Sequence, residues 1–123
     1  MAIRQDPDPR RYLPLTPIVL QVLLALADGP RHGYGIIGEV ALRTDGLIEL
    51  RTGTLYVLLQ RLVEEGVIER ASPDSRDPPV PTPGSPRRYY GLTGFGRAVL
   101  TAEARRLAAV VGQARRQRIL REG

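Results

Sequence analysis

Hydrogen-bonding side chains gather between residues 51 and 61, where leucines at helical spacing begin. Arg51 and Arg61 carry guanidinium groups, and Thr52, Thr54 and Tyr56 carry hydroxyl groups. Such donors at the N-terminal end of a helix, together with its unpaired backbone N–H groups, favour contact with an anion such as phosphate. The structural alternative is that the threonines cap the helix and the tyrosine packs against it. Capping is compatible with anion binding.

The sequence offers few residues for covalent or metal-dependent catalysis. It has no cysteine and one histidine, His32, which excludes disulfides and cysteine-ligated zinc and leaves no visible nucleophile–base pair. We expect His32 to start a helix or to pack, rather than to ligate a metal. The residues therefore indicate a binding protein and not an enzyme, with no metal and no cofactor.

The positive charge is unevenly placed along the 123 residues. The net charge of +5 lies wholly in residues 95–123, because the acids and arginines of residues 1–94 cancel. All 18 basic residues are arginine, which suits phosphate binding but is more simply explained by GC-rich codon usage. Total charge is therefore weak support for nucleic-acid binding, and the local placement of charge has to decide.

No segment predicts export or membrane insertion. The N-terminal MAIRQDPDPRRY is charged and interrupted by proline, unlike a signal peptide. The longest apolar stretch, residues 18–27, is far shorter than the ~20 residues that span a bilayer. We expect a soluble cytoplasmic protein with a single core and no membrane partner.

The first predicted helix begins at Thr16-Pro17 and ends at Asp28-Gly29-Pro30. It is apolar on two faces, so it should be buried on all sides. In so small a protein, the simplest cover for the second face, which contains Leu20 and Leu24, is another subunit. A second helix is predicted over residues 33–44.

Residues 47–50 (LIEL) alternate and predict a short strand. A third helix follows, capped by Thr52 or Thr54 and ended by Gly66. Four leucines at helical spacing form its core face: Leu55, Leu58, Leu59 and Leu62.

Period-two patterns at residues 67–71 and 87–92 predict a hairpin, joined by the proline-rich loop 72–86. Tyr89 and Tyr90 alternate across the second strand, so one should face inward and the other outward. The last helix, about residues 94–120, is capped by Thr93 and carries an apolar seam typical of a contact with a partner subunit. The seam consists of Leu100, Ala104, Leu107, Val111 and Ala114.

Three helices followed by a hairpin predict a mainly α fold, the winged helix-turn-helix, with a long C-terminal dimerisation helix. The domains would be an N-terminal arm (1–14), a winged helix-turn-helix DNA-binding domain (15–93) and the dimerisation helix (94–123). In this fold the third helix enters the major groove, and the hairpin wing lies along the DNA backbone or in the minor groove. We expect the arginines of the last helix to form a solvated face rather than a second DNA contact.

Three motifs resemble the PadR family of bacterial transcriptional regulators: HGYGI (32–36), GTLYVLLQRLVEEGVIE (53–69) and RRYYGLTGFGRAVL (87–100). The single last helix resembles the shorter subgroup. The resemblance implies a homodimer that binds DNA, usually represses, and is often released by a small hydrophobic or aromatic effector. It places Tyr34, Thr54 and Tyr56 at or near the DNA backbone, and Arg87, Arg88 and Tyr89 on a basic wing strand.

The expected partners are double-stranded DNA carrying an inverted-repeat operator and a second copy of the chain. The alternative function is a winged-helix adaptor that binds another protein, supported by the zero net charge of residues 1–94. The predicted dimer interface adds Leu20 and Leu24 to the seam of the last helix. The predicted DNA-binding residues are Tyr34, Arg51, Thr52, Gly53, Thr54, Tyr56, Val57, Gln60, Arg61, Arg87, Arg88 and Tyr89.

Two features depart from the family pattern. The wing tip is long and rich in proline, and the third helix ends in Glu64 and Glu65, which repel phosphate, so that end should point away from DNA. Arg61 could pair with either glutamate. Some members bind flat aromatic compounds in a pore lined by tryptophan, and that mode does not transfer because this chain has no tryptophan.

Overall fold

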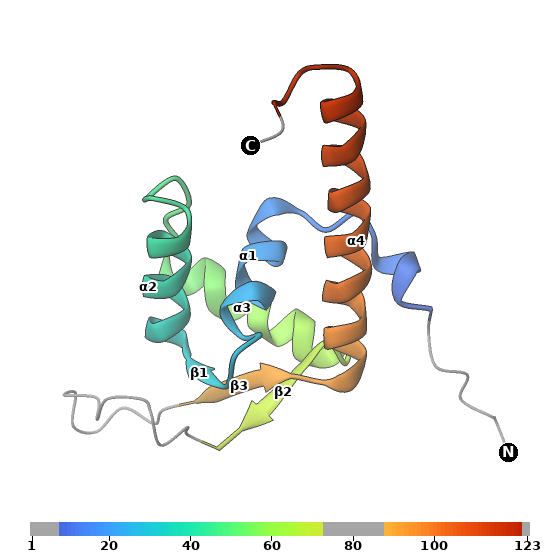
Figure 1. Ribbon diagram of the computed structural model, residues 1–123. Helices are drawn as coiled ribbons and strands as arrows, with labels where there is room; N and C mark the ends of the chain where they lie inside the picture. The colour runs from blue at the N-terminus through green and yellow to red at the C-terminus, as the bar shows by residue number, and fades with distance from the viewer. Residues whose placement is uncertain (1–7, 73–87, 122–123) are drawn as a thin grey trace, which may run out of the picture.

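The computed structural model describes residues 8–72 and 88–121. In that part of the chain a three-helix body is followed by two strands and a long terminal helix (Figure 1). This arrangement confirms the predicted winged-helix fold. The elements are η1 (Pro9–Tyr12), α1 (Pro17–Ala25), β1 (Arg31–His32), α2 (Gly33–Arg43), α3 (Thr52–Glu64), β2 (Ile68–Ala71), β3 (Tyr89–Leu92) and α4 (Gly94–Arg116).

Side-chain caps set the start of three helices. Thr16 accepts a hydrogen bond from the Val19 N–H (3.2 Å), and Thr93 accepts one from the Gly96 N–H (2.9 Å). His32 caps α2 through Nδ1, as expected of a helix-start residue. The predictions of these starts are confirmed, whereas α4 ends at Arg116 rather than at residue 120.

The core lies between α1, α2 and α3, under the sheet. Leucines 55, 59 and 62 are completely buried, and Leu58 is half-buried at the edge of the same face. Burying such a side chain contributes about 1.5–3 kcal/mol, so these residues hold α3 against the body. The predicted core face of the third helix is confirmed. The completely buried residues of the other two helices are Val22, Leu23, Ala25, Ile36 and Val40.

The described strands form one antiparallel sheet in the order β1-β3-β2. The strand predicted at residues 47–50 is wrong: these residues connect α2 to α3, with Leu47 86% exposed and Leu50 buried as an anchor. The first strand is instead β1, whose Arg31 and His32 pair with β3.

The prediction that one of Tyr89 and Tyr90 faces outward is also wrong, because both side chains are buried. Tyr90 packs in the hydrophobic core, whereas Tyr89 packs against His32 of β1. The Tyr89 ring meets the His32 ring edge-on at 5.4 Å between centroids. The Arg70 guanidinium lies over the Tyr90 ring at 5.8 Å.

Residues 8–15, which we call the N-terminal strap, lie against α4. The Tyr12 and Phe95 rings meet edge-on at 5.9 Å, and the Leu15 N–H donates to the Glu103 carboxylate at 2.8 Å. Glu103 is only 1% exposed and also accepts from Arg106, whose hydrogen bonds hold the pKa of the Glu103 carboxyl below its usual value despite burial. The part of the predicted N-terminal arm that the structure describes is therefore fastened to the body.

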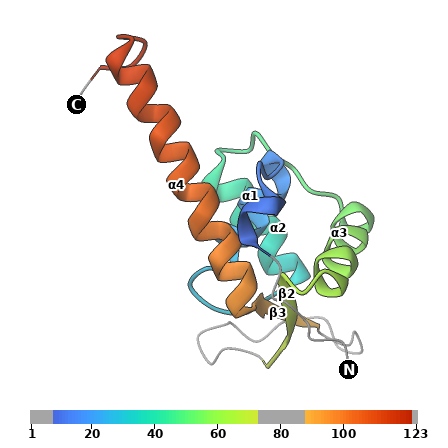
Figure 2. The same cartoon turned by 90° about the vertical axis from the view of Figure 1, so that its right-hand side faces the viewer.

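Helix α4 continues past the body that it packs on. Its first turns contact α1 and β3, and its last turns project beyond them (Figures 1 and 2). No helix in residues 8–72 and 88–121 is long and apolar enough to cross a membrane.

The close approach of α4 to the turn between α3 and β2 depends on Gly96. A Cβ built at Gly96 would lie 1.9 Å from the Val67 carbonyl oxygen, whereas one built at Gly94 meets nothing within 4 Å. We therefore expect Gly96→Ala to lower the free energy of unfolding by about 1–3 kcal/mol or more, with a melting temperature several degrees lower. The matched variant Gly94→Ala should melt near the parent temperature. Equal melting of both variants would contradict this packing.

Candidate nucleic-acid interface

The first turn of α3 is exposed and has no side-chain cap. Arg51 is the N-cap residue and makes no capping hydrogen bond with its side chain, so the prediction that Thr52 or Thr54 caps the helix is wrong. Thr52 and Thr54 belong to the helix instead, and both are exposed, as are Arg51 and Gly53. Their position leaves two threonines and an arginine beside the N-terminal N–H groups of this helix.

Beyond the first turn, the outward face of α3 carries Val57, Gln60 and Arg61, as predicted from the buried leucines. Val57 is 73% exposed. Gln60 Nε2 donates to Glu64 at 3.2 Å, and Arg61 lies 3.4 Å from Glu65, which confirms one of its two predicted pairings. Such exposed pairs contribute at most about 1 kcal/mol, so Arg61 is easily drawn to another anion.

Two tyrosines accompany α3 at the start of α2. Tyr34 is 62% exposed in the first turn of α2. Tyr56 is half-buried, and its hydroxyl lies so close to Gly33 that a Cβ built there would be 2.6 Å from the oxygen. The Tyr56 ring therefore packs, and its hydroxyl lies beside the N-terminus of α2.

The predicted wing residues that the structure describes, Arg88 and Tyr89, have different surroundings. Arg88 is exposed at the start of β3, but Arg87 and residues 73–86 of the predicted loop lie outside the described residues. Tyr89 is only 6% exposed and faces His32, so its side chain does not belong to this surface. Sequence reasoning overlooked Arg70, an exposed cation on β2. The available signal was its place on the strand predicted at residues 67–71, beside the wing loop, because strict alternation does not expose two neighbours such as Glu69 and Arg70.

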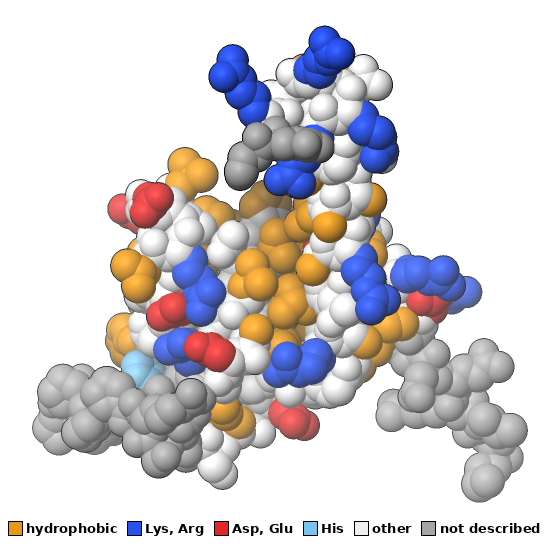
Figure 3. Space-filling model, viewed as in Figure 1, with side chains coloured by type: hydrophobic (Ala, Val, Ile, Leu, Met, Phe, Trp, Pro, Cys, Tyr) orange, Lys and Arg blue, Asp and Glu red, His pale blue; other side chains and the backbone are white. Residues whose placement is uncertain are grey.

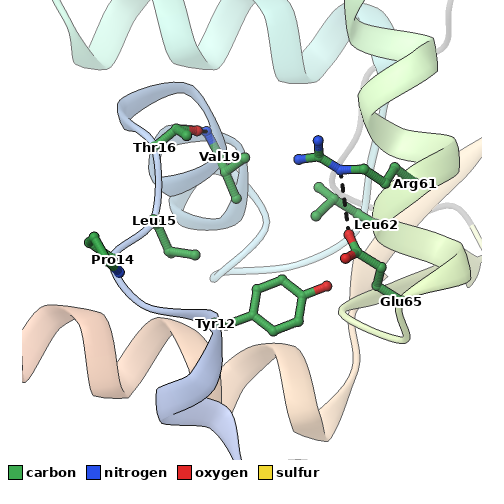
Figure 4. Close-up of a pocket in the computed structure, with 8 residues that line it drawn as sticks. All are labelled: Tyr12, Pro14, Leu15, Thr16, Val19, Arg61, Leu62 and Glu65. Carbon is green, nitrogen blue, oxygen red and sulfur yellow. Dashed lines mark hydrogen bonds and ion pairs between the residues drawn. The ribbon is translucent and has the colours of Figure 1, made fainter.

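A cavity of about 140 Å³ lies between the N-terminal strap, α1 and α3. Figure 4 shows the Tyr12 hydroxyl pointing toward Arg61 and Glu65 across this cavity. The hydroxyl is buried and has no hydrogen-bond partner among the described residues. Burial first, and then the nearby Glu65 carboxylate, raise the pKa of Tyr12, so the hydroxyl stays protonated and can donate. The remaining lining residues are Pro14, Leu15, Thr16, Val19 and Leu62.

The predicted dimer residues fall into two groups. Leu100 is only 7% exposed and belongs to the core of its own chain, so it does not face a partner, because the lower part of α4 packs on the body. Higher on α4, Leu107 and Ala114 are half-buried, and Ala104 and Val111 are exposed. Leu20 and Leu24 on α1 are half-buried. Figure 3 shows hydrophobic side chains gathered over α1 and beside α4, with arginines on the projecting end of α4.

Among the described residues, no group of histidine, aspartate and glutamate could hold a metal ion. The arginines of the last helix have mixed surroundings. Arg97 donates to the Ala27 carbonyl at the end of α1 (3.0 Å), and Arg106 pairs with Glu103. Arg105, Arg115 and Arg116 are exposed.

Comparison with known proteins identifies a matching family and a related protein. Residues 22–102 match the transcriptional regulator PadR-like family. Uncharacterized protein X of Lysinibacillus sphaericus is 33% identical over 96 residues, which cover 78% of this chain and 80% of that protein.

Solved structures share the fold. A PadR family transcription regulator from Clostridium difficile R20291 has a TM-score of 0.61 at 21% identity, over 84% of this chain and 98% of its own. Bacillus subtilis PadR in complex with operator DNA has a TM-score of 0.55 at 19% identity, over 72% of this chain and 46% of its own. With a family match that covers most of its length, this chain belongs to the PadR-like family of transcriptional regulators.

Proposed function

We propose that the protein is a homodimeric DNA-binding repressor of the cytoplasm that responds to a small ligand. The observation that carries the DNA-binding part is the exposed outward face of α3. Its first nine residues carry no charge and two exposed threonines, and Arg51 and Arg61 flank them. The complex of Bacillus subtilis PadR with operator DNA supports this assignment for a chain of the same family.

In this proposal the N-terminal half of α3 enters the major groove. Thr52, Thr54 and Arg51 donate to phosphates or base edges, and the positive end of the helix dipole attracts the DNA backbone. Glu64 and Glu65 repel phosphate at the opposite end, so they orient the helix with its N-terminus toward the groove.

Flanking residues position the helix without reading sequence. Arg70 on β2, and Arg88 directly before the adjacent strand β3, contact phosphates. Tyr34 and the Tyr56 hydroxyl face the backbone at the start of α2, where a phosphate would meet both the helix N-terminus and a hydroxyl donor.

Measuring DNA affinity against salt separates this function from the protein-binding adaptor. Two α3 helices related by a two-fold axis would meet successive major grooves about 10 base pairs apart, so the operator should be an inverted repeat. The observed association constant should fall with salt, with a log–log slope of about −0.9 per phosphate contact. A protein-binding adaptor would show neither a preference for an inverted repeat nor this salt-dependent affinity for DNA. The DNA upstream of the protein's own gene is the first fragment to use.

The dimer part rests on the apolar stripe of α4. The stripe that faces the core through Leu100 continues along the same side of the helix to Leu107, Val111 and Ala114, where its own chain covers it only in part. The half-buried Leu20 and Leu24 of α1 offer a second apolar surface. A second copy covers both stripes in one closed, two-fold interface.

The ligand-responsive part rests on the cavity beside α3. A cavity of about 150 Å³ accommodates one benzene ring, and the cavity beneath Tyr12 has a similar volume of about 140 Å³. Its apolar wall suits a ring, and the Tyr12 hydroxyl can donate to one polar group. A molecule bound there would displace Arg61 and Glu65, which lie on the DNA-facing helix.

Tyr56→Phe should weaken DNA binding without unfolding the protein. The variant keeps the ring that packs near Gly33 and removes only the hydroxyl that faces the backbone phosphate. We expect a loss of about 1 kcal/mol, or about fivefold, in a binding titration at physiological salt. Tyr90→Phe, which changes a buried tyrosine of the sheet, serves as control. Unchanged affinity of Tyr56→Phe would mean that the tyrosine only packs.

Leu107→Glu should dissociate the dimer, because it places an unpaired carboxylate on the apolar stripe at a cost of several kcal/mol. Ala109→Glu adds the same charge to the opposite, exposed side of α4 and should leave the dimer intact. Sedimentation velocity on both variants measures the effect. A dimer that survives Leu107→Glu would place the interface elsewhere.

Benzyl alcohol, which has one ring and one hydroxyl, should release operator DNA from the parent protein at millimolar concentration. Tyr12→Phe removes the donor and should require several-fold more of the alcohol for the same release. The measurement is a DNA-binding titration at increasing alcohol concentration, with cyclohexane-saturated buffer as an apolar control. Equal release from both proteins would argue against this cavity as the effector site.

A further inference from the structure

Four residues lie in one line along the outward side of α3: Gly53, Val57, Gln60 and Glu64. Their spacing of four, three and four residues keeps them on one side of the helix. All four are exposed, and Val57 is the only apolar side chain among them. At 73% exposure, it leaves most of its surface in water.

The surroundings of Val57 allow a close approach to a groove floor. Gly53, one turn before it, has no side chain, and a Cβ built there meets nothing within 4 Å. Gln60, one turn after it, is held by its hydrogen bond to Glu64 at 3.2 Å. The line from Gly53 to Gln60 therefore carries no charge and no large side chain before Val57, with Arg61 beside it one turn later. The only groups that Val57 can present are methyl groups.

The major groove contains one apolar group that methyl groups can contact, the C5 methyl of thymine. We propose that Val57 reads a thymine methyl in each operator half-site. The inference rests on the proposed function, which places α3 in the major groove. It adds a residue that selects sequence by apolar contact, beside the threonines and arginines that bind by hydrogen bonds.

An apolar groove of about 300 Å³ between the start of α1 and α3 also borders Val57. An apolar peptide could enter this groove, which makes protein binding the competing occupant. Leu58 of the same groove is half-buried, whereas Val57 remains 73% exposed after forming its wall. Val57 also stands in line with Gly53 and Gln60, on the side of α3 that the proposed function directs at DNA, so DNA is the occupant that we infer.

Replacing thymine with uracil tests the inference, because uracil lacks only the methyl group and keeps the hydrogen-bonding edge. Operator duplexes are first selected by the purified full-length protein from random sequence. Each thymine is then replaced in turn by uracil. We expect one position per half-site at which the replacement weakens binding about fourfold, the effect of one methyl group. Replacement in both half-sites should weaken binding about 15-fold.

A double-mutant cycle assigns this effect to the residue. With Val57→Ala, thymine and uracil should bind equally at the sensitive position, because the protein methyls that meet the thymine methyl are gone. Leu42→Ala is the matched control: Leu42 is equally exposed, at 73%, but lies near the end of α2. This variant should keep the fourfold preference for thymine.

The outcomes separate the inference from the proposed function. Salt-dependent binding with no uracil-sensitive position, or a thymine preference that survives Val57→Ala, overturns the reading by Val57 and leaves the DNA-binding function standing. Failure to select any duplex, even at low salt, overturns the DNA-binding function and the inference together. Loss of DNA binding in Val57→Ala with an unchanged melting temperature and no thymine preference in the parent would assign Val57 to another contact, which also overturns the inference.

Discussion

The complete burial of Leu55, Leu59 and Leu62 fixes the rotation of α3 about its axis. A rotation of one residue, about 100°, would expose one of these leucines and bury a polar side chain, at a cost of several kcal/mol. Every outward position of α3 follows from this constraint. The buried leucines therefore determine which side chains of α3 can reach a ligand.

A second constraint acts at the base of α4. Gly96 lets the helix backbone meet the Val67 carbonyl in the turn between α3 and β2, and Thr93 fastens the same turn by donating its hydroxyl to the Gly66 carbonyl at 2.6 Å. These contacts set the direction of α4, so its projecting half lies at a fixed angle to α3. In a two-fold dimer that angle determines the spacing of the two α3 helices, and thus the geometry of the operator.

Local patterns in the sequence predict much of this arrangement. The 3.6-residue spacing of the leucines and the Thr16 and Thr93 caps locate the helices, since both signals depend only on near neighbours. The failures involve distant partners. Residues 47–50 alternate but have no neighbouring strand. Tyr89 and Tyr90 are both buried because β1, from the other end of the domain, completes the sheet.

The candidate site was predictable to a similar extent. Outward residues of α3 follow from periodicity, whereas three features needed coordinates: the buried Glu103, the closure of the N-terminal strap, and the contact of Tyr56 with Gly33. Each joins residues that are far apart in the sequence. In the sequence, Glu103 resembles any other charge on a solvated helix face. Only the structure shows that it accepts a hydrogen bond from the Leu15 N–H, 88 residues earlier in the chain.

If α3 enters the major groove as we propose, its charges also moderate how strongly it holds DNA. Arg61 is already paired with Glu65, so binding a phosphate exchanges one exposed ion pair for another. An exposed pair contributes at most about 1 kcal/mol, so breaking it costs little. The net free energy that Arg61 gains on binding a phosphate is still smaller than an unpaired arginine would gain. Arg51 forms no ion pair within residues 8–72 and 88–121, so it has no comparable exchange to make. The two ends of α3 thus differ in function: the first turn supplies attraction, and the last two turns limit it and keep the helix pointing one way.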